Sequence, residues 1–237
     1  MIDADVSTPP AEIKGRIVDA LMELAGEREF EDISIADIAA RAGVGLADFR
    51  DAFPSKGAVL AGFNRRVDRL VLSGKSDALE GEPAKERLFD VLMRRLDAMA
   101  PWRAGVRGVA RWARRDPLAA AALNREALNS TRFMLEAAGV NSEGAVGAVK
   151  LQGLVLAFAR VLDVWFDDEG EGFPATMAAL DRELTRGEKL VGRAEDLHRL
   201  TAPLRGLARS ILDASSRRGG RRRAPEPTDE TAEPEPV

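Results

Sequence analysis

The chain has 237 residues, 45% of them apolar, and a formal net charge of −4, which allows one large domain or two small ones with a sizeable core. It contains no cysteine, which excludes a disulfide framework, a thiol nucleophile and a cysteine-based zinc site, and its single histidine, His198, leaves no histidine cluster for a metal. The first ten residues are acidic and lack an apolar core, and no run reaches the ~18 apolar residues of a membrane span. We therefore expect a cytoplasmic protein that is not an enzyme, with no catalytic residues, no cofactor and no metal site.

Helical periodicity begins directly after these first residues. Pro9 and Pro10 suit a helix start. Apolar side chains then recur at helical spacing as far as about Arg28, which predicts an amphipathic helix.

Residues 34–56 contain two short helical patterns on either side of a glycine turn. Ser34 can cap the first helix together with Asp37, and Gly43 stands where a left-handed residue ends that helix. The apolar positions are Ile35, Ile38, Ala39 and Ala42 in the first pattern, and Leu46, Phe49 and Phe53, a predicted buried stripe, in the second. Pro54 and Ser55 then stop the second helix and cap a third. This is the helix-turn-helix plan, whose second helix enters the DNA major groove.

Every later segment also reads as helix, so the predicted fold is all-α, with a three-helix unit followed by a larger helical domain. Glycine, proline and serine breaks separate the helices. The predicted helices are 55–72, 83–99, 102–115, 117–138, 142–168, 173–189 and 195–213. We expect a helix-turn-helix domain at 9–56, a ligand-binding and dimerisation domain at 57–213, and a disordered tail at 214–237, which is rich in Arg and then in Pro and Glu.

Residues 10–70 resemble the N-terminal domain of TetR-type bacterial repressors. The matching residues are Ile17, Ala20, Leu21, the run 35–39, the run 42–44, Phe49, the run 53–56 and Leu60. The resemblance implies a ligand-responsive repressor that binds a double-stranded DNA operator and forms a homodimer, mainly through its last two long helices. The DNA-binding residues that it and the helix-turn-helix plan indicate are Ser34, Arg41, Gly45, Leu46, Asp48, Arg50 and Lys56. Arg50 is the expected base-edge contact and Lys56 the expected phosphate contact, with Arg65 and Arg66 as further phosphate candidates.

The charge of the N-terminal unit opposes this interpretation. Residues 1–54 contain 12 acidic and 5 basic residues, a formal charge of −7, whereas phosphate contacts need the opposite sign. Three residues also depart from the family pattern on the DNA side, namely Gly45, Ala47 and Arg50.

A second resemblance covers residues 161–184, which are similar to the C-terminal region of bacterial ubiquinone-biosynthesis accessory proteins. It is carried by Trp165, Asp167, Asp168, the run 176–178 and the run 180–182. It implies the same architecture used without DNA, to bind isoprenoid lipid and to contact membranes peripherally. We keep this lipid-binding function as the alternative.

Aromatic and methionine side chains in the helical domain are candidates for a pocket that takes an apolar or aromatic small molecule. They are Trp102, Trp112, Phe133, Met134, Phe158, Trp165 and Met177. Ordinary core packing is the favoured explanation for any one of them, although periodicity does not separate core from pocket. Residues 85–116 carry a basic face with a net charge of +5, for which pairing with the acidic N-terminal unit is favoured over a lipid or acidic ligand. The leucine stripe in 197–211 is expected to pack on the bundle rather than on a membrane surface.

Overall fold

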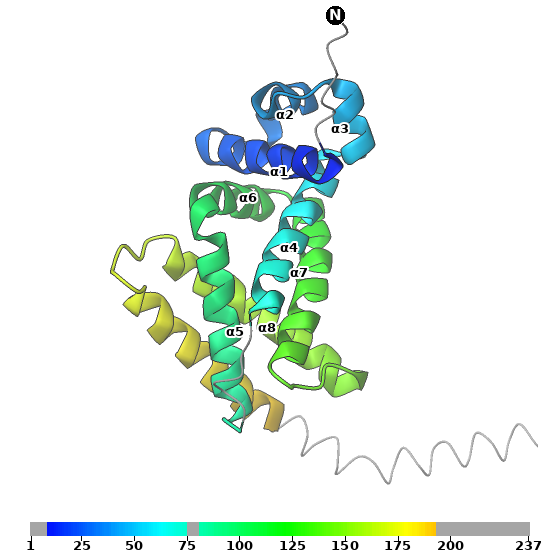
Figure 1. The fold of residues 1–237 in the computed structure, drawn as a ribbon. Helices are drawn as coiled ribbons and strands as arrows, with labels where there is room; N and C mark the ends of the chain where they lie inside the picture. Colours follow the sequence, from blue (N-terminus) through cyan, green and yellow to red (C-terminus); the bar gives the residue numbers. More distant parts are fainter. Residues whose placement is uncertain (1–8, 75–80, 193–237) are drawn as a thin grey trace, which may run out of the picture. The chain divides into compact units, whose positions relative to one another are not determined.

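A computed structural model describes residues 9–74 and 81–192, and within these ranges the regular structure is helical, without strands (Figure 1). The all-α prediction is therefore confirmed. The predicted helix at 195–213 and the tail at 214–237 lie outside the described residues. The described residues up to Val191 form one compact unit.

The N-terminal helices follow the predicted order. They are α1 (Pro10–Glu27), the short 3-10 helix η1 (Phe30–Asp32), α2 (Ile35–Ala42), α3 (Leu46–Ala52) and α4 (Lys56–Ser73). Pro10 occupies the first position of α1, where its missing N–H leaves no hydrogen bond unmade. One face of α1 is almost fully buried through Ile17, Leu21 and Leu24.

Local hydrogen bonds fix the helix-turn-helix as the sequence predicts. The Ser34 hydroxyl accepts from the Asp37 backbone N–H at 3.0 Å, and the Asp37 carboxylate accepts from the Ser34 backbone N–H at 2.9 Å, which is a capping box. Gly43 ends α2 with φ +62° and ψ +42°, a left-handed conformation that glycine adopts without strain. Ser55 caps α4 by accepting from the Ala58 N–H at 3.2 Å.

The predicted buried stripe of α3 is only partly right. Phe49 and Phe53 are buried, but Leu46 is 59% exposed. Ile35, the first residue of α2, is likewise 40% exposed. Both begin their helices, and a helical side chain leans toward the N-terminal end, so it reaches past the first turn instead of onto the core.

The remaining helices also lie close to their predicted bounds. They are α5 (Ala84–Met99), the 3-10 helix η3 (Ala100–Trp102), α6 (Arg103–Arg115), α7 (Pro117–Ala137) and α8 (Gly144–Trp165), followed by a helix over residues 174–192. Asp116 caps α7 by accepting from the N–H groups of Leu118 and Ala119. Buried residues from Ile17 to Leu184 pack into one cluster that the N-terminal helices share with the rest.

α8 is the most apolar of these helices. By length and composition alone it could cross a membrane, with a mean hydropathy of 1.6. In the fold, Leu151, Leu154, Val161 and Trp165 bury one of its faces in the shared core. A core helix satisfies the same test of length and hydropathy, so this property assigns no membrane role.

Candidate nucleic-acid interface and cavity

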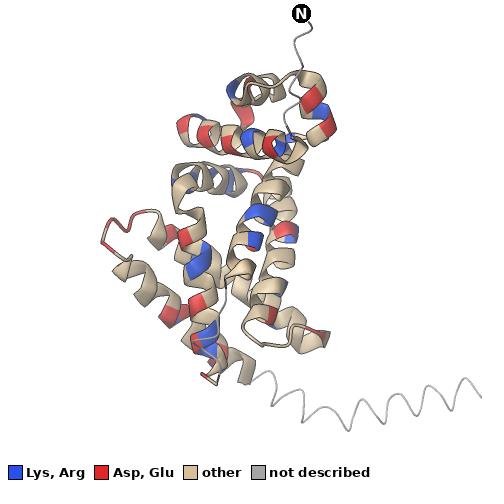
Figure 2. Cartoon of the chain, in the orientation of Figure 1, with Lys and Arg blue, Asp and Glu red and all other residues tan. Residues whose placement is uncertain are grey.

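α3, the expected reading helix, presents one exposed cation between two acids. Arg50 is exposed and makes no ion pair with any described residue, and Asp51 is also exposed. Asp48 instead accepts a hydrogen bond from the Gly45 backbone N–H at 3.2 Å, so it caps its own helix. Figure 2 shows α3 with this mixture of signs. One of the two acids that oppose DNA binding therefore has a local structural role.

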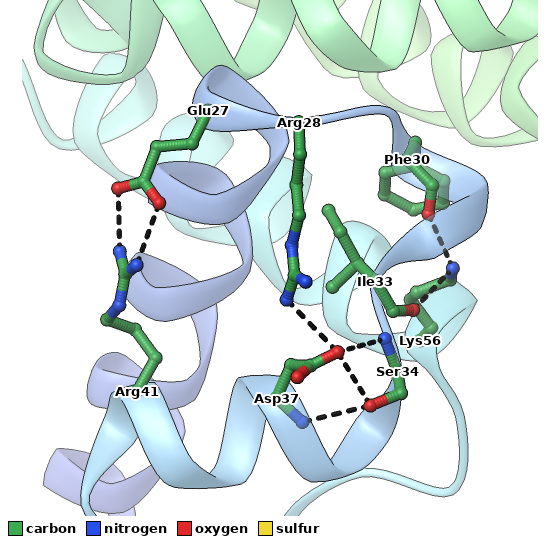
Figure 3. Close-up of polar contacts among 8 residues, drawn as sticks. All are labelled: Glu27, Arg28, Phe30, Ile33, Ser34, Asp37, Arg41 and Lys56. Atoms are coloured by element: carbon green, nitrogen blue, oxygen red, sulfur yellow. Dashed lines mark hydrogen bonds and ion pairs between the residues drawn. The ribbon is translucent and has the colours of Figure 1, made fainter.

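Arg41, an expected DNA contact, is held by acids of α1. Its guanidinium makes two parallel hydrogen bonds with the Glu27 carboxylate, at 2.7 and 2.8 Å (Figure 3). A third hydrogen bond joins it to Glu23 at 3.3 Å. This partnership lowers the pKa of Glu27, chiefly through the Arg41 hydrogen bonds. Arg41 therefore fastens α2 to α1 in this structure.

Ser34, another expected contact, is engaged in the cap of α2. Its hydroxyl also donates to the Asp37 carboxylate at 2.7 Å, and Arg28 pairs with the same carboxylate at 3.0 Å (Figure 3). The hydrogen bonds from the Ser34 backbone and hydroxyl, followed by Arg28, lower the pKa of Asp37. Arg28, which the sequence analysis did not single out, thus ties the end of α1 to the start of α2.

Lys56, the expected phosphate contact, faces the preceding segment. Its ammonium donates to the carbonyl oxygens of Phe30 at 2.7 Å and of Ile33 at 2.9 Å, and lies 4.4 Å from the centre of the Phe30 ring (Figure 3). Burial lowers its pKa, although Glu31 and Asp32 act in the opposite direction. Two of the three N–H donors are therefore used to anchor η1 to α4, which leaves one for an external anion.

Two further arginines near the motif have different surroundings. Arg16 of α1 reaches the turn, because its Nη1 would lie 4.0 Å from a Cβ on Gly43. Its buried Nε makes no hydrogen bond to a residue that the structure describes. Arg65 is exposed without an ion pair to a described residue, whereas Arg66 binds Asp19 at 2.7 Å. The sequence pattern gives no signal for Arg16, because its place beside the turn depends on how α1 packs.

A cavity of about 210 Å³ lies among α1, α4, α5, α6, α7 and α8. Of the predicted pocket residues, Phe158 lines it. Met134 and Trp165 are fully buried core residues, and Phe133 and Met177 are exposed by 54% and 38%. Trp112 stacks on Phe30 with ring centres 4.3 Å apart, and Trp102 packs edge-on against Phe63 at 5.6 Å.

A larger apolar groove of about 480 Å³ lies along α8 and the helix over residues 174–192. Exposed apolar side chains line it, namely Val149, Leu156 and Leu190.

The basic face of α6 closes the end of α8. Arg103 donates to the backbone carbonyls of Trp165 and Asp168, and Arg107 to that of Phe166. These cations satisfy carbonyls that a helix C-terminus leaves unpaired and match its negative dipole. Arg115 of α6 forms an ion pair with Glu29 of the N-terminal unit at 2.7 Å. The other arginines named here bind the end of α8 instead.

The acidic cluster after α8 has structural partners. Asp168 accepts from the backbone N–H and the hydroxyl of Thr176, each at 2.8 Å. Arg107 and Arg114 bind Asp167 and Asp163. In the described part of the chain, no group of three or more His, Cys, Asp or Glu side chains is placed to hold a metal ion.

Comparison with known proteins gives the class of this fold. Residues 17–62 match the sequence model of the bacterial regulatory proteins of the tetR family. A TetR transcriptional regulator from Nitrosomonas europaea ATCC 19718 is 25% identical over 74% of this chain and 97% of its own, with a TM-score of 0.58. A TetR regulator from Rhodococcus sp. RHA1 is 21% identical over 75% of this chain and 96% of its own, with a TM-score of 0.54. A tetR-family regulator from Streptomyces coelicolor is 16% identical over 87% of this chain and 98% of its own, with a TM-score of 0.52.

Fold and motif together define a helix-turn-helix protein of the transcription-regulator class. The resemblance to the TetR family is confirmed: the N-terminal domain is a TetR-type helix-turn-helix domain, and the fold is that of TetR-family regulators. The comparisons do not favour the second resemblance, to ubiquinone-biosynthesis accessory proteins. No curated protein matches the sequence.

Proposed function

We propose that the protein is a ligand-responsive transcriptional repressor that acts on double-stranded DNA as a homodimer in the bacterial cytoplasm. The observation that carries this proposal is the TetR-type motif with an exposed α3 whose Arg50 has no ion-pair partner among the described residues. An unpaired guanidinium on a reading helix can form two parallel hydrogen bonds with guanine O6 and N7.

Phosphate binding is supported by less charge than is usual for a DNA-binding unit. Arg41 is occupied by Glu23 and Glu27, and Lys56 by two carbonyl oxygens. The remaining donors are the backbone N–H groups at the start of α4, the third N–H of Lys56, and Arg16 and Arg65. We therefore expect specific binding that depends strongly on base contacts and weak binding to random sequence.

The cavity supports a response to a ligand. Met22 of α1 lines it together with Val106 and Val109 of α6. A bound molecule would therefore touch the first helix of the DNA-binding unit and the helix that packs against it. In a dimer, two reading helices must lie about 34–36 Å apart to enter successive major grooves. A ligand that binds better to a state with another spacing releases the DNA.

The groove along α8 supports a dimer. Its exposed apolar side chains leave water when a second copy of the chain packs against them. This is also where the resemblance to TetR-type repressors places the subunit contact.

Fluorescence anisotropy with labelled duplex DNA tests the proposal. At ~50 mM salt, random duplex should bind with a Kd in the micromolar range, and selection from a random pool should enrich a palindromic site, since dimers read two half-sites. Failure to bind any duplex at micromolar protein in this buffer would overturn it, because non-specific electrostatic affinity is strongest at low salt.

A further inference from the structure

A buried ion pair lies beside the cavity, and the activity proposed above does not use it. Arg95 of α5 is 6% exposed and forms an ion pair with Asp68 of α4. The other oxygen of that carboxylate accepts a hydrogen bond from the Ser130 hydroxyl of α7 at 2.8 Å. Removing two charges from water is unfavourable, and apolar residues of the same volume would fill such a site with equal or better stability. The pair is thus weakly explained by stability alone.

Only one of the two charged side chains lines the cavity. Arg95 is among the lining residues and Asp68 is not, so the cation faces the empty space and the carboxylate supports it from behind. The Arg95 hydrogen bond to the Asn64 side-chain oxygen is long, at 3.5 Å. Because a guanidinium has five N–H donors, several remain for a bound molecule.

The polar groups beside Arg95 can also donate. Asn64 and Thr131 line the same cavity, and neither the Asn64 amide nitrogen nor the Thr131 hydroxyl has a hydrogen-bond partner in ranges 9–74 and 81–192. The polar side of the cavity therefore offers one cation and two further donors. An acceptor with negative charge satisfies this set, and charge-assisted hydrogen bonds are roughly twice as strong as neutral ones.

Apart from Ser130, whose hydroxyl already donates to Asp68, the remaining wall is apolar and includes two aromatic rings, those of Phe63 and Phe158. The cavity volume of about 210 Å³ exceeds the ~150 Å³ cavity that holds a benzene molecule. It therefore has room for one aromatic ring and a short polar substituent. Phe63 and Phe158 can pack against such a ring edge-on or offset.

From this arrangement we infer that the cavity binds a small aromatic carboxylate, with the carboxylate on Arg95 and the ring between Phe63 and Phe158. The inference rests on the proposed function, since it names the ligand class of the proposed regulator. A cationic ligand is disfavoured because Asp68 lies behind Arg95 and is already paired.

Calorimetric titration of the full chain without DNA tests this inference with two matched probes, trans-cinnamate and its uncharged analogue cinnamamide. At pH 7, trans-cinnamate should bind about tenfold more tightly or better, the ratio expected for hydrogen bonds to a charged group. Equal affinity for the two probes would overturn the inference, and so would the absence of any trans-cinnamate binding tighter than about 1 mM.

A paired substitution locates the effect. The single variant Arg95→Gln would leave the half-buried Asp68 without its cation and is expected to lower the stability of the fold. The double variant Arg95→Gln with Asp68→Asn removes both charges and leaves an uncharged amide at each position, so it should still bind cinnamamide and lose the preference for trans-cinnamate. The control variant Arg69→Gln, at an exposed position of α4 outside the cavity, should keep that preference. A double variant that retained the preference would contradict the assignment to Arg95.

The result is independent of DNA binding. Anisotropy with duplex DNA reports on the repressor proposal, whereas the titration reports on the cavity. DNA binding without discrimination between the two probes would refute the ligand class and leave the repressor function standing. A preference for trans-cinnamate without any DNA binding would support the ligand class and refute the repressor function.

Discussion

Gly108 of α6 lies against the backbone of Ala25 in α1, so closely that a Cβ on Gly108 would be 1.8 Å from the Ala25 carbonyl oxygen. Gly105 makes the same approach to Met22, with 2.1 Å between its would-be Cβ and the Met22 oxygen. Spaced three residues apart, the two glycines share one face of α6. The first helix of the DNA-binding unit and a helix that lines the cavity are therefore in direct backbone contact.

This contact predicts that Gly108→Ala destabilises the protein. The new methyl group must push α6 away from α1, and overpacking of this kind typically costs about 1–3 kcal/mol of unfolding free energy. Urea denaturation followed by circular dichroism measures it. The control is Gly15→Ala, also in a helix but with nothing within 4 Å of the new Cβ, which should be neutral or raise stability by up to ~1 kcal/mol. Equal stability of Gly108→Ala and the natural protein would show that the two helices can separate freely.

Arg50 and Arg41 should contribute unequally to DNA binding. Arg50→Gln removes a guanidinium of α3 that pairs with no acid in the described part of the chain, and it should weaken binding to a selected site about tenfold or more. Arg41→Gln removes a group already bound to Glu23 and Glu27, so the change in affinity should be much smaller. Anisotropy titrations at one salt concentration compare the two. An equal loss for both variants would mean that Arg41 leaves its acids on binding DNA.

The sequence predicted those parts of the site that depend on neighbours along the chain. The Ser34–Asp37 capping box and the left-handed Gly43 follow from spacing within one turn of helix. Local pattern also predicted the order and bounds of the described helices closely, since proline, glycine and capping residues separate them.

Contacts between distant segments were beyond such reasoning. Arg41 meets Glu27 and Glu23 across 14 and 18 residues, and Lys56 meets Phe30 across 26. Their roles depend on how α1, η1 and α4 pack. The cavity shows the same limit: an apolar side chain at helical spacing can face core, cavity or solvent, and Met134, Phe158 and Phe133 respectively do so.

Leu156→Glu should separate the proposed dimer. Leu156 lines the groove along α8 and is 52% exposed in the single chain, so in a dimer a carboxylate there would be buried without a partner. Sedimentation velocity should find the natural protein as a dimer and this variant as a monomer. The control Leu118→Glu, at an 82% exposed position outside the groove, should leave the dimer intact. A dimeric Leu156→Glu protein would place the subunit contact elsewhere.

Asp168 should make the connection after α8 sensitive to acid. Hydrogen bonds from the Thr176 backbone and hydroxyl, and from the Gly170 N–H, hold its pKa below the ordinary value of 3.8. Because the folded state favours the charged form, its contribution to stability is fully present above pH 3.8. It is lost as the pH falls through the lowered pKa. Asp168→Asn, which stays uncharged, should therefore melt below the natural protein at neutral pH.

The pH dependence of that difference is the decisive measurement. Melting temperatures of the two proteins should converge as the pH is lowered below 3.8, because Asp168 then becomes protonated in the natural protein as well. The control Glu169→Gln removes an adjacent exposed acid that makes no hydrogen bond or ion pair with a described residue, so its melting temperature should follow the natural protein throughout. A difference between Asp168→Asn and the natural protein that stayed constant from neutral pH into acid would show that the hydrogen-bond geometry of Asp168, and not its charge, stabilises the connection.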